Sequence, residues 1–93
     1  MAWAEEQSYE EMIRALQNFT AQVEEQCTVM ENAGKDCVDN MEGDPAAEKS
    51  NEKLNGCIQN IRGTFDTVQN IAAALQEELE RIREAARKAD AAY

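Results

Sequence analysis

Three cysteines, Cys27, Cys37 and Cys57, are the most reactive side chains in this sequence. Nine and nineteen residues separate them, whereas cysteine ligands of a metal usually come in closely spaced pairs. An odd number of cysteines also does not suit a closed disulfide framework. We therefore expect three reduced thiols that pack as small apolar residues. A single disulfide between the two helices, Cys27 to Cys57, is the alternative.

The composition offers few of the residues that other kinds of catalysis require. The 93 residues include no His, so the commonest general base is missing, as is the residue that most often activates a thiol. Gly43, Gly56 and Gly63 are isolated glycines and form no phosphate-binding loop. The many carboxylates fall at solvated helical positions. The sequence predicts no catalytic residue, no metal site, no cofactor and no small-molecule substrate.

The net charge restricts the classes of molecule that could be the binding partner. There are 19 acidic and 9 basic residues, a formal net charge of −10, which argues against nucleic acid and anionic lipid. No run approaches the ~18 apolar residues of a membrane span. The acidic N-terminus lacks the basic region and apolar run of a secretory signal. We expect another protein as the partner, with no nucleic acid and no membrane span.

One interruption divides the chain into two long periodic stretches. Gly43 suits the left-handed position that closes a helix, Asp44 suits an N-cap, and Pro45 suits the first residue of a helix. We therefore predict an all-α antiparallel hairpin over 1–93, with helices at about 4–41 and 45–91 and a turn at 42–45.

Apolar residues recur in steps of three and four along both stretches, as in a coiled coil. The first stretch shows one extra step of four, between Val23 and Cys27, which predicts a local shift of the apolar seam. The residues expected in the core or interface are Tyr9, Met12, Leu16, Phe19, Val23, Met30, Ile58, Ile61, Phe65, Val68, Leu75 and Leu79.

Some apolar residues fall outside this seam. They are Ile13, Val29, Val38, Cys57 and Ile71. A wide seam of the kind that globular helices have would account for them. The functional interpretation is a second face that docks another hairpin to form a four-helix bundle. The end of the second helix should extend past the first, and its residues Ile82, Ala86, Ala89 and Tyr93 are candidates for recognition by a partner or a secretion apparatus.

In size, acidity and helical pattern the chain resembles the ESAT-6-like, or WXG100, superfamily of helical hairpins. The family's Trp-x-Gly turn corresponds to Met41-Glu42-Gly43, with the glycine matched and the tryptophan replaced. The family's export motif, Tyr-x-x-x-Asp/Glu after the second helix, has no counterpart, because Tyr93 is the last residue. A chain that continues past Tyr93, or a partner, would then supply the signal.

The resemblance implies a protein of the type VII secretion route, either secreted without a cleavable signal peptide or cytoplasmic before export. It implies a role as a secreted protein or as a targeting partner or chaperone of a larger LXG-type effector. The partner would be a second copy, a related hairpin or the helical domain of that effector. The residues alone leave two alternatives open, namely a cytoplasmic coiled-coil adaptor or chaperone and an acidic inhibitor or antitoxin.

Overall fold

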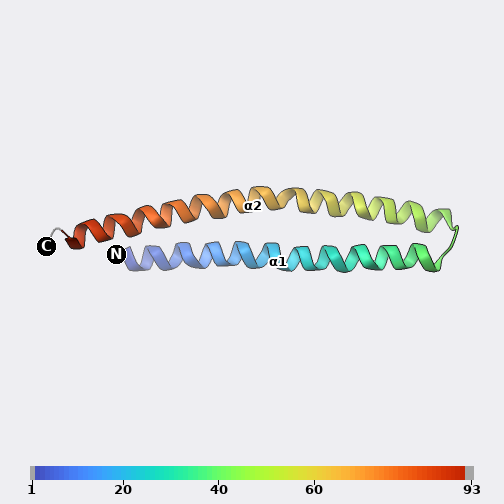
Figure 1. Ribbon diagram of the computed structural model, residues 1–93, viewed down its shortest axis with the longest axis horizontal. Helices are drawn as coiled ribbons and strands as arrows, with labels where there is room; N and C mark the ends of the chain where they lie inside the picture. Colours follow the sequence, from blue (N-terminus) through green and yellow to red (C-terminus); the bar gives the residue numbers. More distant parts are fainter. Residues whose placement is uncertain (1, 92–93) are drawn as a thin grey trace. The chain divides into compact units, whose positions relative to one another are not determined.

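Two long α-helices joined by a short turn form a hairpin (Figure 1). The computed structural model describes the backbone of residues 2–91 and the side chains of residues 4–91. Helix α1 spans Ala2–Asn40 and helix α2 spans Pro45–Ala91. No strand occurs among these described residues. The prediction of an all-α antiparallel hairpin is therefore confirmed.

The turn between the helices is closed by local hydrogen bonds. Gly43 has φ of 75°, a left-handed conformation that carries no steric cost for glycine. The N–H of Asp44 donates to the carbonyl of Met41 over 2.9 Å. The Asp44 side chain accepts from the N–H of Ala46 over 2.9 Å, which satisfies one of the free donors at the start of α2. Helix stop, cap and first helical residue thus occupy positions 43–45.

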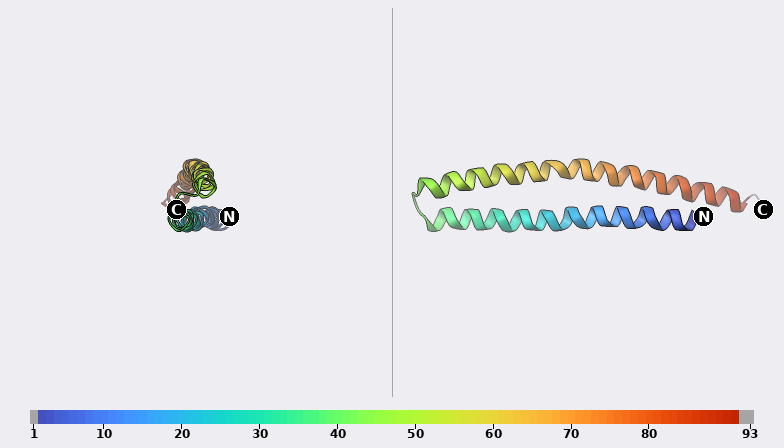
Figure 2. Two further views of the ribbon diagram at one scale, coloured as in Figure 1. Left: turned by 90° about the vertical axis from the view of Figure 1, so that its right-hand side faces the viewer. Right: turned by 180° about the vertical axis from the view of Figure 1, so that it is seen from behind.

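Packing divides the hairpin into two compact units, each with a segment of both helices. Unit 1 comprises Met1–Phe19 and Thr67–Tyr93, and unit 2 comprises Thr20–Asp66. Within each unit the α1 segment runs beside the α2 segment in all the views (Figures 1 and 2). Each unit therefore has its own seam of side chains, and the two are described separately below.

Few of the described side chains are buried. In unit 1 they are Ile13 and Leu79, and in unit 2 they are Cys27 and Ile58. No polar or charged side chain is buried among the described residues. The other expected core residues that lie on the seam are half-buried: Tyr9, Leu16, Val23, Met30, Ile61, Phe65, Val68 and Leu75. A single seam between two helices thus leaves most core candidates partly in contact with solvent.

Two predicted core residues lie elsewhere. Met12 and Phe19 are each 52% exposed, so they are not part of the core between the two helices, and their assignment to an interface stays a prediction. The inward position next to Met12 belongs to Ile13, which is 7% exposed and was expected on a second face. Thr20, next to Phe19, is half-buried.

The polar character of Thr20 explains the error. Regular steps of four and three connect a set of buried or half-buried α1 positions: Tyr9, Ile13, Leu16, Thr20, Val23, Cys27, Met30 and Gly34. A search for apolar residues passes over Thr20 and selects Phe19 instead, which creates an artificial extra step later. The seam shift predicted between Val23 and Cys27 is therefore absent, and the heptad spacing continues through it.

Candidate interaction surface

The cysteines have unequal surroundings and no partner. All three thiols are free, with Cys27 buried and Cys37 and Cys57 exposed. Over residues 2–91, no group of three or more His, Cys, Asp or Glu side chains is placed to hold a metal ion. No helix in that range is long and apolar enough to cross a membrane. The remaining candidates for a functional site are the surfaces on either side of each seam.

One side of the seam in unit 1 is polar. Arg83 donates a hydrogen bond to Glu10 on α1 and another, over 3.2 Å, to Glu80 on α2. These ion pairs border a groove whose polar walls include Arg14 and Gln17 and whose floor is the buried pair Ile13 and Leu79. We call the polar groove residues Glu10, Arg14, Gln17, Gln76 and Arg83 the polar flank.

The other side of the same seam is apolar. A shallow groove of about 350 Å³ there is lined by Ser8, Tyr9, Met12 and Leu75. Phe19 follows Met12 by seven residues, and Ile71 precedes Leu75 by four, so helix periodicity places each on the same face as its neighbour. We call Tyr9, Met12, Phe19, Ile71 and Leu75 the apolar flank. Three of its five members are large side chains exposed by 43–52%.

Balanced charges border the apolar flank. Arg81 donates two hydrogen bonds to Glu78. The hydrogen bond to Glu78 raises the pKa of the Arg81 guanidinium, and Tyr9 and Glu5 add smaller electrostatic contributions. The same bond lowers the pKa of Glu78 below its ordinary value. Glu78 follows Leu75 by three residues and Ile71 by seven, so helix periodicity places this pair at the edge of the apolar flank.

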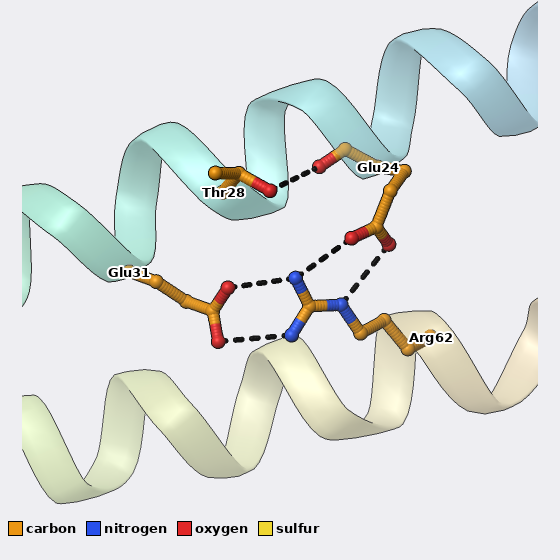
Figure 3. A network of polar contacts seen from close by, with 4 residues as sticks. All are labelled: Glu24, Thr28, Glu31 and Arg62. Carbon is orange, nitrogen blue, oxygen red and sulfur yellow. Dashed lines mark hydrogen bonds and ion pairs between the residues drawn. The ribbon is translucent and has the colours of Figure 1, made fainter.

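Unit 2 is bridged by one arginine held between two glutamates (Figure 3). Arg62 on α2 donates to both carboxylate oxygens of Glu24, over 3.0 and 2.8 Å, and to both of Glu31, over 2.9 and 2.7 Å. The planar guanidinium suits such two-pronged pairing. Glu24 and Glu31 are seven residues apart on α1, which places them on one face of that helix.

The electrostatics of this bridge follow its geometry. The hydrogen bond from Arg62 lowers the pKa of Glu31 below its usual range. The bonds to Glu31 and Glu24 raise the pKa of Arg62 in turn. The arginine side chain is 27% exposed and both glutamates are more so, so solvent screens the pair. Sequence reasoning did not single out these residues, although the seven-residue spacing of the glutamates was a usable signal.

A close contact between helices occurs at Gly34 in unit 2. A Cβ atom at Gly34 would lie well inside van der Waals distance of Asn51 Oδ1 and 3.1 Å from Leu54 Cδ2. Asn51 Oδ1 is buried and accepts no hydrogen bond. At Gly34, therefore, side chains of α2 pack directly against the backbone of α1. Gly56 and Gly63 have no such neighbour within 4 Å.

The candidate recognition residues at the end of α2 have mixed exposure. Ile82 and Ala86 are half-buried, and Ala89 is exposed. Tyr93 lies outside the described residues. Figure 1 shows the last turns of α2 extending beyond the first turn of α1, as the mismatch in helix length predicts.

Among the residues expected on a second face, Val29 in unit 2 is 54% exposed.

Comparisons with known proteins identify no relative of this chain, because no family profile, curated protein or solved structure matches it.

Proposed function

We propose that this chain is a protein-binding module, a helical hairpin that completes its core by packing against another helical hairpin. Its exposed area carries the proposal. The chain exposes 6993 Å², whereas a folded monomer of its mass is expected to expose about 5,400 Å². With only four apolar side chains buried among residues 4–91, the excess surface is the part that a partner would cover.

The proposed biological setting is type VII secretion, in the manner of WXG100 proteins. Support comes from the two-helix hairpin, its length, its acidity and the glycine that closes its turn. The module would act as a secreted protein or as a targeting partner or chaperone of a larger effector. Helix packing is the mechanism in either role, since no chemical step is required of it.

An acidic inhibitor is the second candidate, and the distribution of charge favours it. Residues 1–43 carry ten acids and two bases, whereas residues 44–93 carry nine acids and seven bases. An acidic α1 would suit a basic partner surface, mainly by speeding association and selecting the partner. The apolar side chains exposed in unit 1 have no role in that candidate.

Export from a Gram-positive host that has a type VII system tests the proposed setting. The full chain is produced in that host and in a strain lacking the secretion ATPase, and both culture media are probed, with a cytoplasmic protein as the lysis control. We expect the chain in the medium only when the ATPase is present. Equal amounts in the two media, or complete retention in cells that contain its partner, would overturn the secretion role.

A variant lacking residues 86–93 examines the end of α2 in the same assay. We expect this variant to keep its helical circular dichroism and to lose export or partner capture. If truncation abolishes the helical signal, this end is part of the folded core and its recognition role is wrong. If export and partner capture are unchanged, recognition lies elsewhere on the chain.

A further inference from the structure

We infer that the groove on the polar flank of unit 1 is a binding site for a carboxylate side chain of another protein, and that Arg14 pairs with this carboxylate. The polar flank lies on the opposite side of the seam from the apolar flank. The site therefore provides a contact in addition to the packing between hairpins, and it does not depend on the secretion setting. Its residues are Glu10, Arg14, Gln17, Gln76 and Arg83, over a floor of Ile13 and Leu79.

Arg14 is unpaired, unlike every other arginine in the described part of the chain. Those that form an ion pair with at least one glutamate are Arg62, Arg81, Arg83 and Arg87. Arg14 is exposed and makes no hydrogen bond or ion pair with any described residue. A guanidinium carries several N–H donors and no acceptor. Arg14 therefore holds unused donors for an acceptor that lies outside the chain.

The carboxylates nearest to Arg14 along α1 are engaged elsewhere. Residues three and four positions apart are neighbours on a helix, and on the N-terminal side of Arg14 these are Glu10 and Glu11. Glu10 accepts a hydrogen bond from Arg83 on α2, and Glu11 accepts one from Gln7 over 3.5 Å. The residues at the same distances on the C-terminal side are uncharged amides. A carboxylate for Arg14 must therefore come from another molecule.

The shape of the groove suits one acidic side chain. Its volume of about 190 Å³ is below the ~300–1,000 Å³ of typical small-molecule pockets, so a single side chain fits better than a free ligand. The methylene groups of a glutamate would lie over Ile13 and Leu79, which are 7% and 2% exposed. The Gln17 amide, three residues from Arg14, has no partner among the described residues. It would donate a hydrogen bond to the same carboxylate.

Charge selects a carboxylate over other groups at this groove. Its lining includes two arginines and one glutamate, an excess of one positive charge, whereas the whole chain carries −10. A basic side chain would meet the like charge of Arg14, and a neutral one would lack charge-assisted hydrogen bonds. A carboxylate matches the planar guanidinium with two parallel bonds. Because the net charge repels a strongly acidic protein, we expect this carboxylate on a neutral or basic surface of the partner.

Nitrogen-15 NMR of the full chain tests this site through the side-chain N–H signals of Arg14 and Gln17. The probe is a capped, alanine-rich helical peptide with one central glutamate, and its match has glutamine at that position. We expect the glutamate peptide to shift both signals saturably and to bind about tenfold more tightly than the glutamine peptide. Arg14→Gln should abolish this preference and keep its helical circular dichroism, because Arg14 is exposed.

Lys35→Gln is the matched control. Lys35 is also an exposed base without a partner among the described residues, but it lies in unit 2. This variant removes the same charge as Arg14→Gln and should leave peptide binding unchanged. Arg14→Lys keeps the charge and loses the planar fork of donors, so it should bind the glutamate peptide more weakly than the unaltered chain does.

Four other outcomes would contradict the inference. Equal binding of the two peptides would overturn carboxylate recognition, and the absence of a saturable shift would overturn the site itself. A loss of binding in Lys35→Gln as large as that in Arg14→Gln would mean attraction by net charge alone, which also overturns the site. Inorganic phosphate that shifts the Arg14 signal at lower concentration than the glutamate peptide would overturn a carboxylate side chain as the occupant. Export through the type VII route is measured separately, so the secretion setting and this site can fail independently.

Discussion

Gly34 offers a test of the helix packing in unit 2 through a single methyl group. Replacing glycine by alanine within a helix normally stabilises the fold by about 1 kcal/mol, because alanine loses less backbone entropy. Gly56→Ala and Gly63→Ala should show this gain, since a Cβ at either position meets no atom within 4 Å. At Gly34 the new Cβ would collide with Asn51 Oδ1 and press on Leu54 Cδ2 at 3.1 Å.

The collision should cancel or reverse this gain. An added methyl group that overpacks its surroundings costs about 1–3 kcal/mol, which offsets or exceeds the gain in helix propensity. We expect Gly34→Ala to range from neutral to a loss of about 2 kcal/mol. For a domain of this size, 1 kcal/mol shifts the midpoint by about 4–8 °C. The thermal midpoint of Gly34→Ala should therefore lie at least about 4 °C below that of Gly56→Ala.

Thermal melts followed by circular dichroism measure these shifts, with all chains at one concentration because self-association would raise the midpoint. The double variant Gly34→Ala with Asn51→Ala is the control. It removes the obstructing oxygen, which is also a buried acceptor without a partner, so it should recover the stability that Gly34→Ala loses. If Gly34→Ala stabilises as much as Gly56→Ala, the close approach at this position is wrong.

Two further perturbations examine the core and the charge bridge. Ile58→Ala should cost about 2–5 kcal/mol, because Ile58 is 1% exposed; a denaturant titration that gives the same loss for the exposed Ile71→Ala would contradict the burial pattern. The hydrogen bond from Arg62 lowers the pKa of Glu31 from its ordinary value of 4.5. A carboxyl with a lowered pKa in the folded state stabilises the fold above its unfolded pKa and loses that contribution as pH falls through the folded value. Carbon-13 NMR titration should therefore show the Glu31 pKa rising toward 4.5 in Arg62→Gln, and an unchanged titration would contradict the bridge.

The hairpin itself was predictable because its strongest signals are local. Gly43, Asp44 and Pro45 each favour one backbone position of a turn, and they act without distant partners. The spacing of three and four is equally local, since it follows from the helical repeat. Fold class and approximate helix bounds could thus be derived without knowing how the helices meet.

The identity of the inward-facing residues was less predictable, because it depends on the partner helix. Residue type favoured Met12 and Phe19, whereas the packing places Ile13 and Thr20 at the seam. A two-helix seam is narrow, so a displacement of one residue moves a side chain from the seam to its edge. The bridge at Arg62 was missed for a related reason. Its partners lie 31 and 38 residues away, and periodicity within one helix carries no information about such pairs.

Polar contacts in unit 2 explain how this seam can select one alignment of its helices. Sliding α2 by one heptad would keep apolar residues facing apolar residues, so the stripe alone discriminates poorly between registers. The same slide would leave Arg62 beside only one of Glu24 and Glu31, because these glutamates are one heptad apart, and would place Asn51 opposite a residue other than Gly34. These polar side chains thus make the wrong register less stable. The large apolar side chains outside the seam are not needed to select the register. Met12, Phe19 and Ile71 lie in unit 1, take no part in these polar contacts and are 43–52% exposed, which leaves them available for contact with a second chain.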